Sequence, residues 1–269
     1  MKKLFTVLLS VLLVLGLTAC GGSSADSGES TETNDPLADA LLTSGKIIVA
    51  TSPDYPPFES LSASGELEGF EIEMIGQLVD VLNEQLGTSY EIEFKQMSFD
   101  TIISAVQAKQ ADIGLSAFSY TEERAQMVGF CNTHISTNQM IITRNDTGIA
   151  SPEDFEAGMK VGAPESTTAY MIVSEYFPEL EVVTPGDYTV IFQNLVAGNL
   201  DLVVADYAVG INYVNENDNL VMCEEPLLSE TLSMIVNIDN TTLKDALNTA
   251  LDTYLASEQY QALKDAWGM

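Results

Sequence analysis

Residues 102–113 read IISAVQAKQADI, and residues 191–202 read IFQNLVAGNLDL. Each stretch has apolar residues at helical spacing, then a short polar turn, then an aspartate, Asp112 or Asp201, just before an apolar run typical of a buried strand. We interpret this repeat as two similar α/β lobes rather than one large sheet. The alternative is that any two helix–strand units look alike.

The segments around the first copy alternate between strand and helix patterns. Strands are expected at residues 47–50, 91–94 and 112–115, and helices at residues 70–86 and 99–108, with Gly87 as a stop signal for the first helix. Alternation of this kind favours an α/β fold with helices on the faces of central sheets. Ligands of such folds bind at the carboxyl ends of the strands, here in a cleft between the lobes.

The first residues have the layout of a secretory signal. Lys2 and Lys3 precede an apolar run over residues 4–17, which is too short to span a bilayer comfortably. The run ends in Leu-Thr-Ala before Cys20, which resembles the lipobox of bacterial lipoproteins. We therefore expect residues 1–19 to be a signal peptide and Cys20 to be lipidated, so that the protein is held by its lipid at the extracellular face of the cell membrane. An ordinary signal peptide followed by a chance cysteine is the alternative.

Residues 20–44 are rich in Gly, Ser, Thr, Asp and Glu, and we expect a flexible tether there. The whole chain carries 40 acidic against 10 basic residues, a formal net charge of −30. A surface for nucleic acid or anionic lipid headgroups needs the opposite sign, so we expect neither partner. The chain has one histidine, His134, and no CxxC or HxxxH spacing, so no metal or other cofactor is expected.

Polar side chains gather after the expected strands, at one predicted edge. Arg124 and the turn over residues 166–168 could bind a carboxylate, because a guanidinium and the N–H groups at a helix start present converging donors. Asp206 and Ser116 could accept hydrogen bonds from an ammonium. The two sites together would suit a zwitterionic amino acid. Alternatively, Arg124 pairs with a surface acid and Asp206 caps the helix that follows it.

Several stretches resemble the polar amino-acid-binding proteins of ABC importers, solute-binding protein family 3. They are ATSPDYPPFE at 50–59, GFEIE at 69–73 and SAFSYTEER at 116–124, with further similarity at 129–130, 160–162 and 197–201. Their order covers nearly all of residues 46–268. The resemblance implies a two-lobed periplasmic-binding-protein-like (type II) fold. It also implies a monomer that binds a free amino acid and works with the permease subunits of an ABC importer.

The resemblance also implies a set of ligand-binding residues. Arg124 would bind the α-carboxylate with support from Thr167 and Thr168, and Asp206 would hold the α-ammonium. Two aromatic side chains would flank the ligand. The full set is Tyr55, Phe99, Ser116, Ala117, Ser119, Arg124, Ser166, Thr167, Thr168 and Asp206. The chain departs from the family where Ala117 stands in place of a hydroxyl or glycine, and where Ser166 stands in place of the usual glycine.

With the double crossover of that family, lobe 1 would comprise residues 45–137 and 228–269, and lobe 2 residues 138–227. Cys131 and Cys223 each precede an implied crossing, which makes them a candidate hinge disulfide.

The ligand's side chain is harder to predict. As the resemblance implies, relatives that bind cationic side chains often have a carboxylate at the position of Ser52, and that acid is missing here. Asp54 and Glu165 are close in the sequence and could reach into the pocket, but we expect them to face water, as exposed loop acids more often do. A buried cation without a partner would be costly. We therefore predict a neutral amino acid over Lys, Arg, Asp or Glu.

Three other functions compete with this reading. The same fold resembles secreted cyclohexadienyl dehydratases, in which Glu59 or Glu165 could serve as an acid or base. The sequence has no nucleophile elbow, Ser-His-Asp set or metal constellation, so a binding protein is preferred over an enzyme. An extracellular sensor lobe that passes its ligand to a separate receptor and a purely structural acidic lipoprotein are the others.

Overall fold

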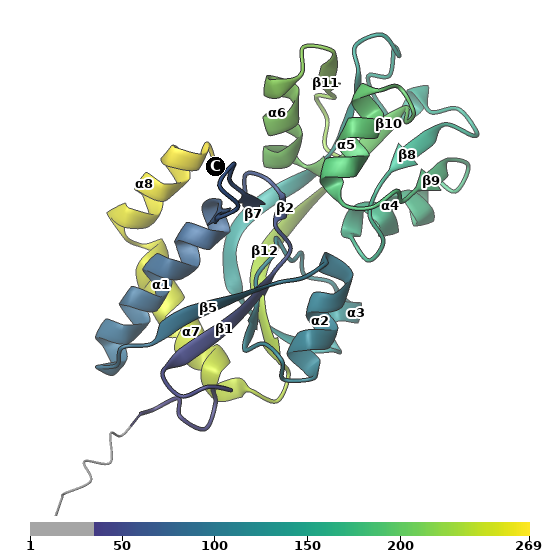
Figure 1. Cartoon of the computed structure of the whole chain (residues 1–269). Coiled ribbons are helices and arrows are strands. Elements are labelled where there is room, and N and C mark those ends of the chain that lie inside the picture. Colours follow the sequence, from purple (N-terminus) through teal and green to yellow (C-terminus); the bar gives the residue numbers. More distant parts are fainter. Residues whose placement is uncertain (1–34) are drawn as a thin grey trace, which may run out of the picture. The chain divides into compact units, whose positions relative to one another are not determined.

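The structure is a computed structural model, which describes residues 35–269 (Figure 1). Its strands are β1 (Lys46–Thr51), β2 (Asp54–Tyr55), β3 (Glu59–Leu61), β4 (Leu67–Glu68), β5 (Glu91–Gln96), β6 (Ile113–Gly114), β7 (Val128–Arg144), β8 (Lys160–Gly162), β9 (Glu181–Val183), β10 (Leu202–Asp206), β11 (Leu220–Met222) and β12 (Leu228–Asn237). Its helices are α1 (Phe70–Leu86), α2 (Phe99–Gln107), α3 (Glu122–Ala125), α4 (Thr168–Tyr176), α5 (Tyr188–Val196), α6 (Tyr207–Glu216), α7 (Thr241–Leu255) and α8 (Glu258–Trp267), with one 3₁₀ turn at Pro152–Asp154. The helix predicted over residues 70–86 is confirmed, as are the strands and helices on either side of it, within two residues at each end.

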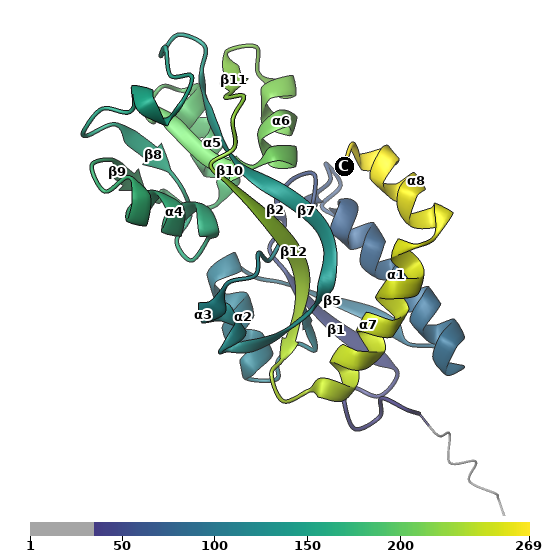
Figure 2. The same ribbon diagram turned by 180° about the vertical axis from the view of Figure 1, so that it is seen from behind.

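Two groups of parallel strands are joined by two long antiparallel ones. The strand order is β5-β1-β6-β12-β7-β10-β8-β9, with β11 paired to β7 and a separate small sheet of β2, β3 and β4. The first part of β7 pairs with β12, and its last part pairs with β10 and β11. Figures 1 and 2 show β7 and β12 running from one lobe into the other. The two-lobed α/β fold is therefore confirmed. The expectation that there would not be one large sheet is wrong, because these two strands carry the hydrogen-bond ladder across.

The central strands are buried on both faces. Ile47 and Val49 of β1 belong to the apolar cluster that includes α1 and α7, whereas Ile48 and Ala50 belong to the cluster that includes α2. Successive residues of a strand point to opposite faces. The continuous apolar run at residues 47–50 thus fits a strand covered on both sides, as parallel sheets require.

The internal repeat is visible in the structure. Asp112 accepts hydrogen bonds from the N–H groups of Ile48 (2.8 Å) and Leu42 (3.0 Å), and Asp201 accepts one from the N–H of Lys160 (2.7 Å). Each aspartate thus ties the turn after its helix to a parallel strand of its own lobe, β1 for Asp112 and β8 for Asp201. This shared tie is the structural reason why both copies place an aspartate there.

The packed part of the chain begins earlier than predicted. Leu37 and Leu41 are buried against the first lobe's core, and Leu42 is bonded to Asp112. The predicted tether over residues 20–44 is therefore too long, because its last apolar residues were overlooked and they cover the core. The predicted signal peptide, Cys20 and the start of the tether lie outside the described residues. Within residues 35–269, no helix is both long and apolar enough to cross a membrane.

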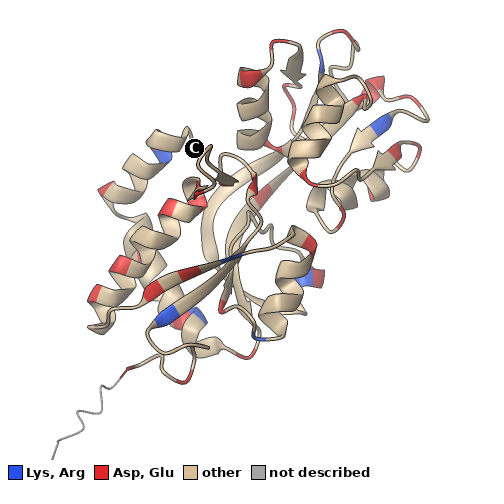
Figure 3. Ribbon diagram, in the orientation of Figure 1, with Lys and Arg blue, Asp and Glu red and all other residues tan. Residues whose placement is uncertain are grey.

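The candidate disulfide is not formed. Cys131 and Cys223 are free, buried thiols. Cys131 packs in the cluster that includes α1 and α7, whereas Cys223 packs in a separate cluster with Ile141 and Val161 of the second lobe. Figure 3 shows acidic residues spread over the helices and loops of both lobes rather than gathered at one site.

Candidate ligand-binding site

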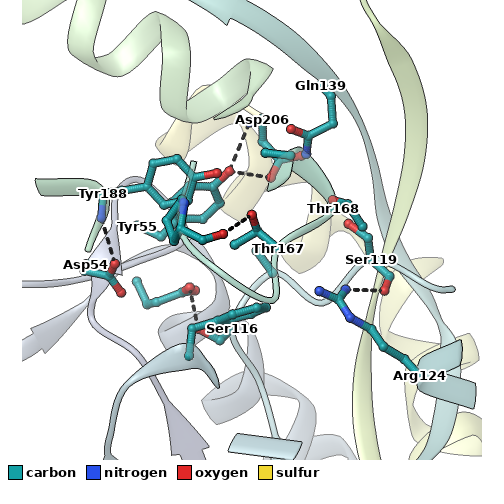
Figure 4. Close-up of a pocket in the computed structure, with 15 residues that line it drawn as sticks. Asp54, Tyr55, Ser116, Ser119, Arg124, Gln139, Thr167, Thr168, Tyr188 and Asp206 are labelled. Atoms are coloured by element: carbon teal, nitrogen blue, oxygen red, sulfur yellow. Dashed lines mark hydrogen bonds between the residues drawn. The ribbon is translucent and has the colours of Figure 1, made fainter. Parts of the chain in front are cut away.

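A pocket between the lobes contains about 460 Å³ of space not filled by atoms (Figure 4). It brings together all of the predicted ligand residues except Ser166, which contributes through its carbonyl as described below. The lining residues are Asp54, Tyr55, Glu59, Phe99, Ser116, Ala117, Ser119, Arg124, Gln139, Pro164, Thr167, Thr168, Ala169, Tyr188 and Asp206. Their roles as ligand contacts stay predictions, which the following geometry supports.

Arg124 is a buried cation held in place by uncharged groups. Thr121 caps the start of α3 by accepting a hydrogen bond from the N–H of Arg124 (3.1 Å). The guanidinium donates to the carbonyls of Ser119 and Ser166 (2.7 Å each), one from each side of the pocket. Burial lowers its pKa to about 10, so it keeps its charge near neutral pH. No ion pair involves Arg124 within residues 35–269, so the alternative of a surface pair is wrong.

Two aromatic rings support the guanidinium of Arg124. Phe99 and Phe118 are stacked at 4.7 Å, and the guanidinium carbon lies 5.5 and 5.6 Å from their centres. Cation–π contacts of this kind stabilise a partly desolvated cation. By contrast Arg144, the other arginine, donates to the carbonyl of Leu200 (2.6 Å) next to the end of α5 and lies outside the pocket lining.

Asp206 is a buried carboxyl with one oxygen unused. It ends β10, where Tyr55 Oη donates to its Oδ2 (2.6 Å) and accepts from its backbone N–H (3.0 Å). Its Oδ1 is buried and has no hydrogen-bond partner in the described part of the chain. Although Asp206 stands at the N-cap position of α6, its side chain makes no capping bond, so the alternative of a simple cap is wrong. Burial raises its pKa from 3.8 to about 7.

Two buried carboxyls fix the first-lobe wall: Glu59, which the sequence predicted near the cleft only as a candidate acid or base, and Glu71, which it did not predict there. Ser116 Oγ donates to Glu59 Oε1 (2.9 Å), and the N–H of Ala117 donates to Glu71 Oε2 (2.9 Å). Glu71 Oε1 is also hydrogen-bonded to His134 Nε2 (2.7 Å). Burial and the neighbouring Glu71 raise the pKa of Glu59 well above its usual value. Most acidic residues of such an acidic chain are expected on the solvated surface, so no signal in the sequence indicated a structural role of Glu59 or Glu71.

The second-lobe wall is the start of α4. Thr167 caps this helix by accepting from the N–H of Tyr170 (3.1 Å), and Thr168 and Ala169 of its first turn line the pocket. Ser166 adopts a φ of 66°, a left-handed conformation that favours glycine. This explains why the resembling family usually has glycine at the position of Ser166.

The aromatic wall includes a residue that the sequence analysis missed. Tyr55 lies 4.5 Å from Tyr188, centre to centre, in a tilted arrangement. Tyr188 starts α5 and reads as an ordinary core residue, and Gln139 lies within the long strand β7, so neither carries a local signal of binding.

Asp54 lines the pocket and does not simply face water. Its carboxylate accepts from Ser52 Oγ (2.5 Å) and from the N–H of Tyr188 (3.2 Å), which connects the two lobes. Burial raises its pKa. The expectation that Asp54 is solvated is therefore wrong, and an acid does stand beside the position of Ser52. Glu165 is exposed as expected. Among residues 35–269, no group of three metal-binding side chains is present.

The fold is that of a two-lobed binding protein, and the pocket at the lobe junction contains the buried cation Arg124 and the buried carboxyl Asp206. Residues 47–269 match the model of the bacterial extracellular solute-binding proteins, family 3, and the chain belongs to this family.

The chain is also similar to proteins that are named for the amino acids they bind. The chain is 26% identical over 269 residues to the ABC transporter glutamine-binding protein GlnH of Bacillus subtilis (strain 168), with 99% of this chain and 97% of that protein covered. It is 28% identical over 271 residues to the arginine-binding extracellular protein ArtP of the same organism, covering 99% and 98%. A solved structure, an ancestral arginine-binding protein bound to arginine, is 30% identical with a TM-score of 0.74, covering 83% of this chain and 98% of that one.

Proposed function

We propose that the protein captures a free amino acid between its lobes and delivers it to the permease of an ABC importer. The observation that carries this proposal is that Arg124 and Asp206 line the same pocket and that each lacks a partner of opposite charge among residues 35–269. Among residues 35–269, no carboxylate forms an ion pair with the Arg124 guanidinium, and the buried Oδ1 of Asp206 has no hydrogen-bond donor. An α-carboxylate and an α-ammonium would supply the two missing partners.

The remaining walls suit the rest of the ligand. The N–H groups at the start of α4 would add to the guanidinium as carboxylate donors, as helix N-termini do for anions. The side chain would extend between Tyr55 and Phe99 toward Asp54. A neutral side chain was predicted for lack of an acid in this wall. Since Asp54 lines the pocket, cationic side chains belong in the test as well.

A thermal-shift panel tests the class of ligand. It should contain the twenty amino acids with ornithine, citrulline and cystine. A ligand that binds only the folded state raises the free energy of unfolding by about 2.7 kcal/mol at a hundredfold excess over its Kd. We expect one or a few amino acids to raise the melting temperature. If none does, the proposed function is wrong.

Substitutions at the two charged residues test the site. Arg124→Ala and Asp206→Asn should each weaken the best amino acid of the panel by about 2–5 kcal/mol in calorimetry, because one charged end of the ligand would be left unpaired. Lys95→Ala and Asp146→Asn are matched controls that remove the same charges away from the pocket. Binding by either site variant within threefold of the wild type would show that the site is assigned wrongly.

An enzymatic role on the same fold has one observation in its favour. The Glu59 carboxyl lines the pocket with a raised pKa, as a general acid would. Its hydrogen bond with Ser116 serves equally well to shape a binding wall. Incubation with prephenate or arogenate, followed by ultraviolet absorbance, separates the two roles, and we expect no turnover.

The location is part of the same proposal. A lipid on Cys20 would keep the protein at the outer face of the membrane, beside a permease. Mass spectrometry of the N-terminal peptide from membrane-extracted protein should show a diacylated Cys20. An unmodified peptide that begins at another residue would favour an ordinary signal peptide. Delivery itself is tested by uptake of the bound amino acid in cells with and without this protein.

A further inference from the structure

Three hydrogen bonds converge on one carboxylate oxygen at the edge of the pocket. Glu230 lies on β12, and its Oε2 accepts from Ser119 Oγ (2.7 Å), Thr168 Oγ1 (2.9 Å) and Gln139 Nε2 (3.0 Å). All three donor residues line the pocket, whereas Glu230 lies just behind them and lines a neighbouring groove together with Thr168. No other described carboxylate oxygen accepts bonds from so many pocket side chains.

The donors come from both lobes. Ser119 follows β6 in the first lobe, and Thr168 begins α4 in the second. Glu230 therefore connects the two sides of the pocket, in addition to the bonds made by Arg124 with Ser166 and by Tyr55 with Asp206. Glu230 also raises the pKa of Arg124, although burial lowers that pKa by more, so its charge acts on the guanidinium.

We propose that Glu230 is an internal competitor of the ligand's carboxylate. This inference rests on the proposed function. Its Oε2 holds the two hydroxyl donors, Ser119 and Thr168, that stand beside Arg124 and that an incoming α-carboxylate would need. An amino acid binds by taking these hydroxyls from Glu230, so that one carboxylate replaces another.

Three physical effects make this competition weaken binding. Each hydroxyl has a single proton to donate, and a bond to a charged acceptor is stronger than one to a neutral acceptor. In addition, two carboxylates close together repel each other in a partly buried site. A conformation in which Glu230 already holds the lobes together is also less able to admit ligand, which raises the apparent Kd. Glu230 thus lowers the affinity and favours release of the amino acid.

The test compares Glu230→Gln with the wild type by calorimetry. Glutamine keeps the shape and one acceptor but removes the charge. The control is Glu175→Gln, which removes a charge from the exposed part of the same groove and leaves the pocket donors untouched. The probes are L-arginine and L-glutamine, together with their amides, L-argininamide and L-glutaminamide, in which the carboxylate is replaced by a neutral group.

We expect Glu230→Gln to bind the free amino acid about tenfold more tightly. The reason is that the side chain at position 230 would then hold Ser119 and Thr168 by hydrogen bonds to a neutral amide oxygen, which are weaker than bonds to a carboxylate. The matching amide should gain less than about twofold, because it has no carboxylate to compete, and Glu175→Gln should equal the wild type. Weaker binding by Glu230→Gln, or an equal gain for the amide or for Glu175→Gln, would overturn the inference.

A second measurement does not depend on a ligand. X-ray scattering without added amino acid should give a larger radius of gyration for Glu230→Gln than for the wild type, because the bond between Glu230 and Thr168 of the second lobe is weakened. Equal radii would also overturn the inference. If the wild type binds no amino acid at all, the proposed function fails, and this comparison still decides whether Glu230 holds the lobes together.

Discussion

The most unusual residue in this acidic protein is its buried arginine. A charged group that leaves water needs compensating partners, and these are more often carboxylates than carbonyls. Arg124 instead has two carbonyls and two aromatic rings, and no carboxylate of residues 35–269 forms an ion pair with it, so an added anion can do so. Asp206, on the other side of the pocket, is similar, because its Oδ1 is buried and has no hydrogen-bond donor within the described residues 35–269.

The raised pKa of Asp206 predicts that the affinity for the amino acid depends on pH. The protonated carboxyl cannot pair with an ammonium, and burial raises this pKa to about 7. The affinity for the amino acid should therefore fall as the pH drops below about 7, with a slope that approaches tenfold per pH unit. Calorimetry across this range measures it.

Asp206→Asn is the control for this pH dependence. It has no carboxyl to protonate, so its weak binding should lack the decline that Asp206 causes. An affinity of the wild type that stays constant from above pH 7 to well below it would contradict the prediction.

At the scale of elements, the start of α1 depends on a close backbone approach. Gly69 precedes the helix with a φ of 138°, and a Cβ atom there would lie 2.2 Å from the carbonyl oxygen of Phe58. Such a contact is impossible without moving the backbone next to Glu59, which lines the pocket. A side chain at position 69 would therefore displace the backbone that carries Glu59 in the pocket wall.

Gly69→Ala should destabilise the protein by about 3 kcal/mol or more, because it combines a steric clash with an unfavourable φ. The matched control is Gly76→Ala, which lies inside the same helix with open space around its Cα. That change should stabilise the protein by about 0.5–1 kcal/mol through helix propensity. Denaturant unfolding measures both changes. Equal stability of the two variants would show that the contact at Gly69 relaxes without cost.

At the scale of the whole molecule, the two lobes share β7 and β12. Strand β7 pairs with β12 in one half and with β10 in the other, so one covalently continuous strand belongs to both lobes. The pocket lies beside this shared region, where Gln139 of β7 and the bond from Thr168 to Glu230 of β12 meet. A rotation about these strands would open or close the pocket, as hinges do in other two-lobed proteins.

We therefore predict that the bound amino acid makes the molecule more compact. The radius of gyration should decrease when the best ligand of the panel is added. The decrease should be larger for Glu230→Gln, in which the lobes are held less firmly beforehand. If neither protein changes its radius on binding, the pocket is preformed and no hinge motion accompanies capture.

The sequence alone determined much of this protein. The repeated helix–turn–Asp–strand units predicted the two lobes, and they succeed because apolar periodicity and turn chemistry are local properties. The stop at Gly87 is confirmed for the same reason, since its left-handed φ of 67° is a local requirement of the helix end. The order of family-like motifs was sufficient to predict the family, and nine of the ten candidate ligand residues that it implied line one pocket.

Only the tertiary structure decided which strands pair, where the cysteines pack and which acidic residues are buried beside the pocket. The single sheet depends on pairing between β7 and strands far away in the chain, and the free thiols depend on which core each cysteine joins. Asp54, Glu71 and Glu230 are three of 40 acidic residues, and nothing local separates them from solvated ones. Burial and distant donors give each its function, because the free energy of a charge depends on what surrounds it in space and not on its neighbours in the sequence.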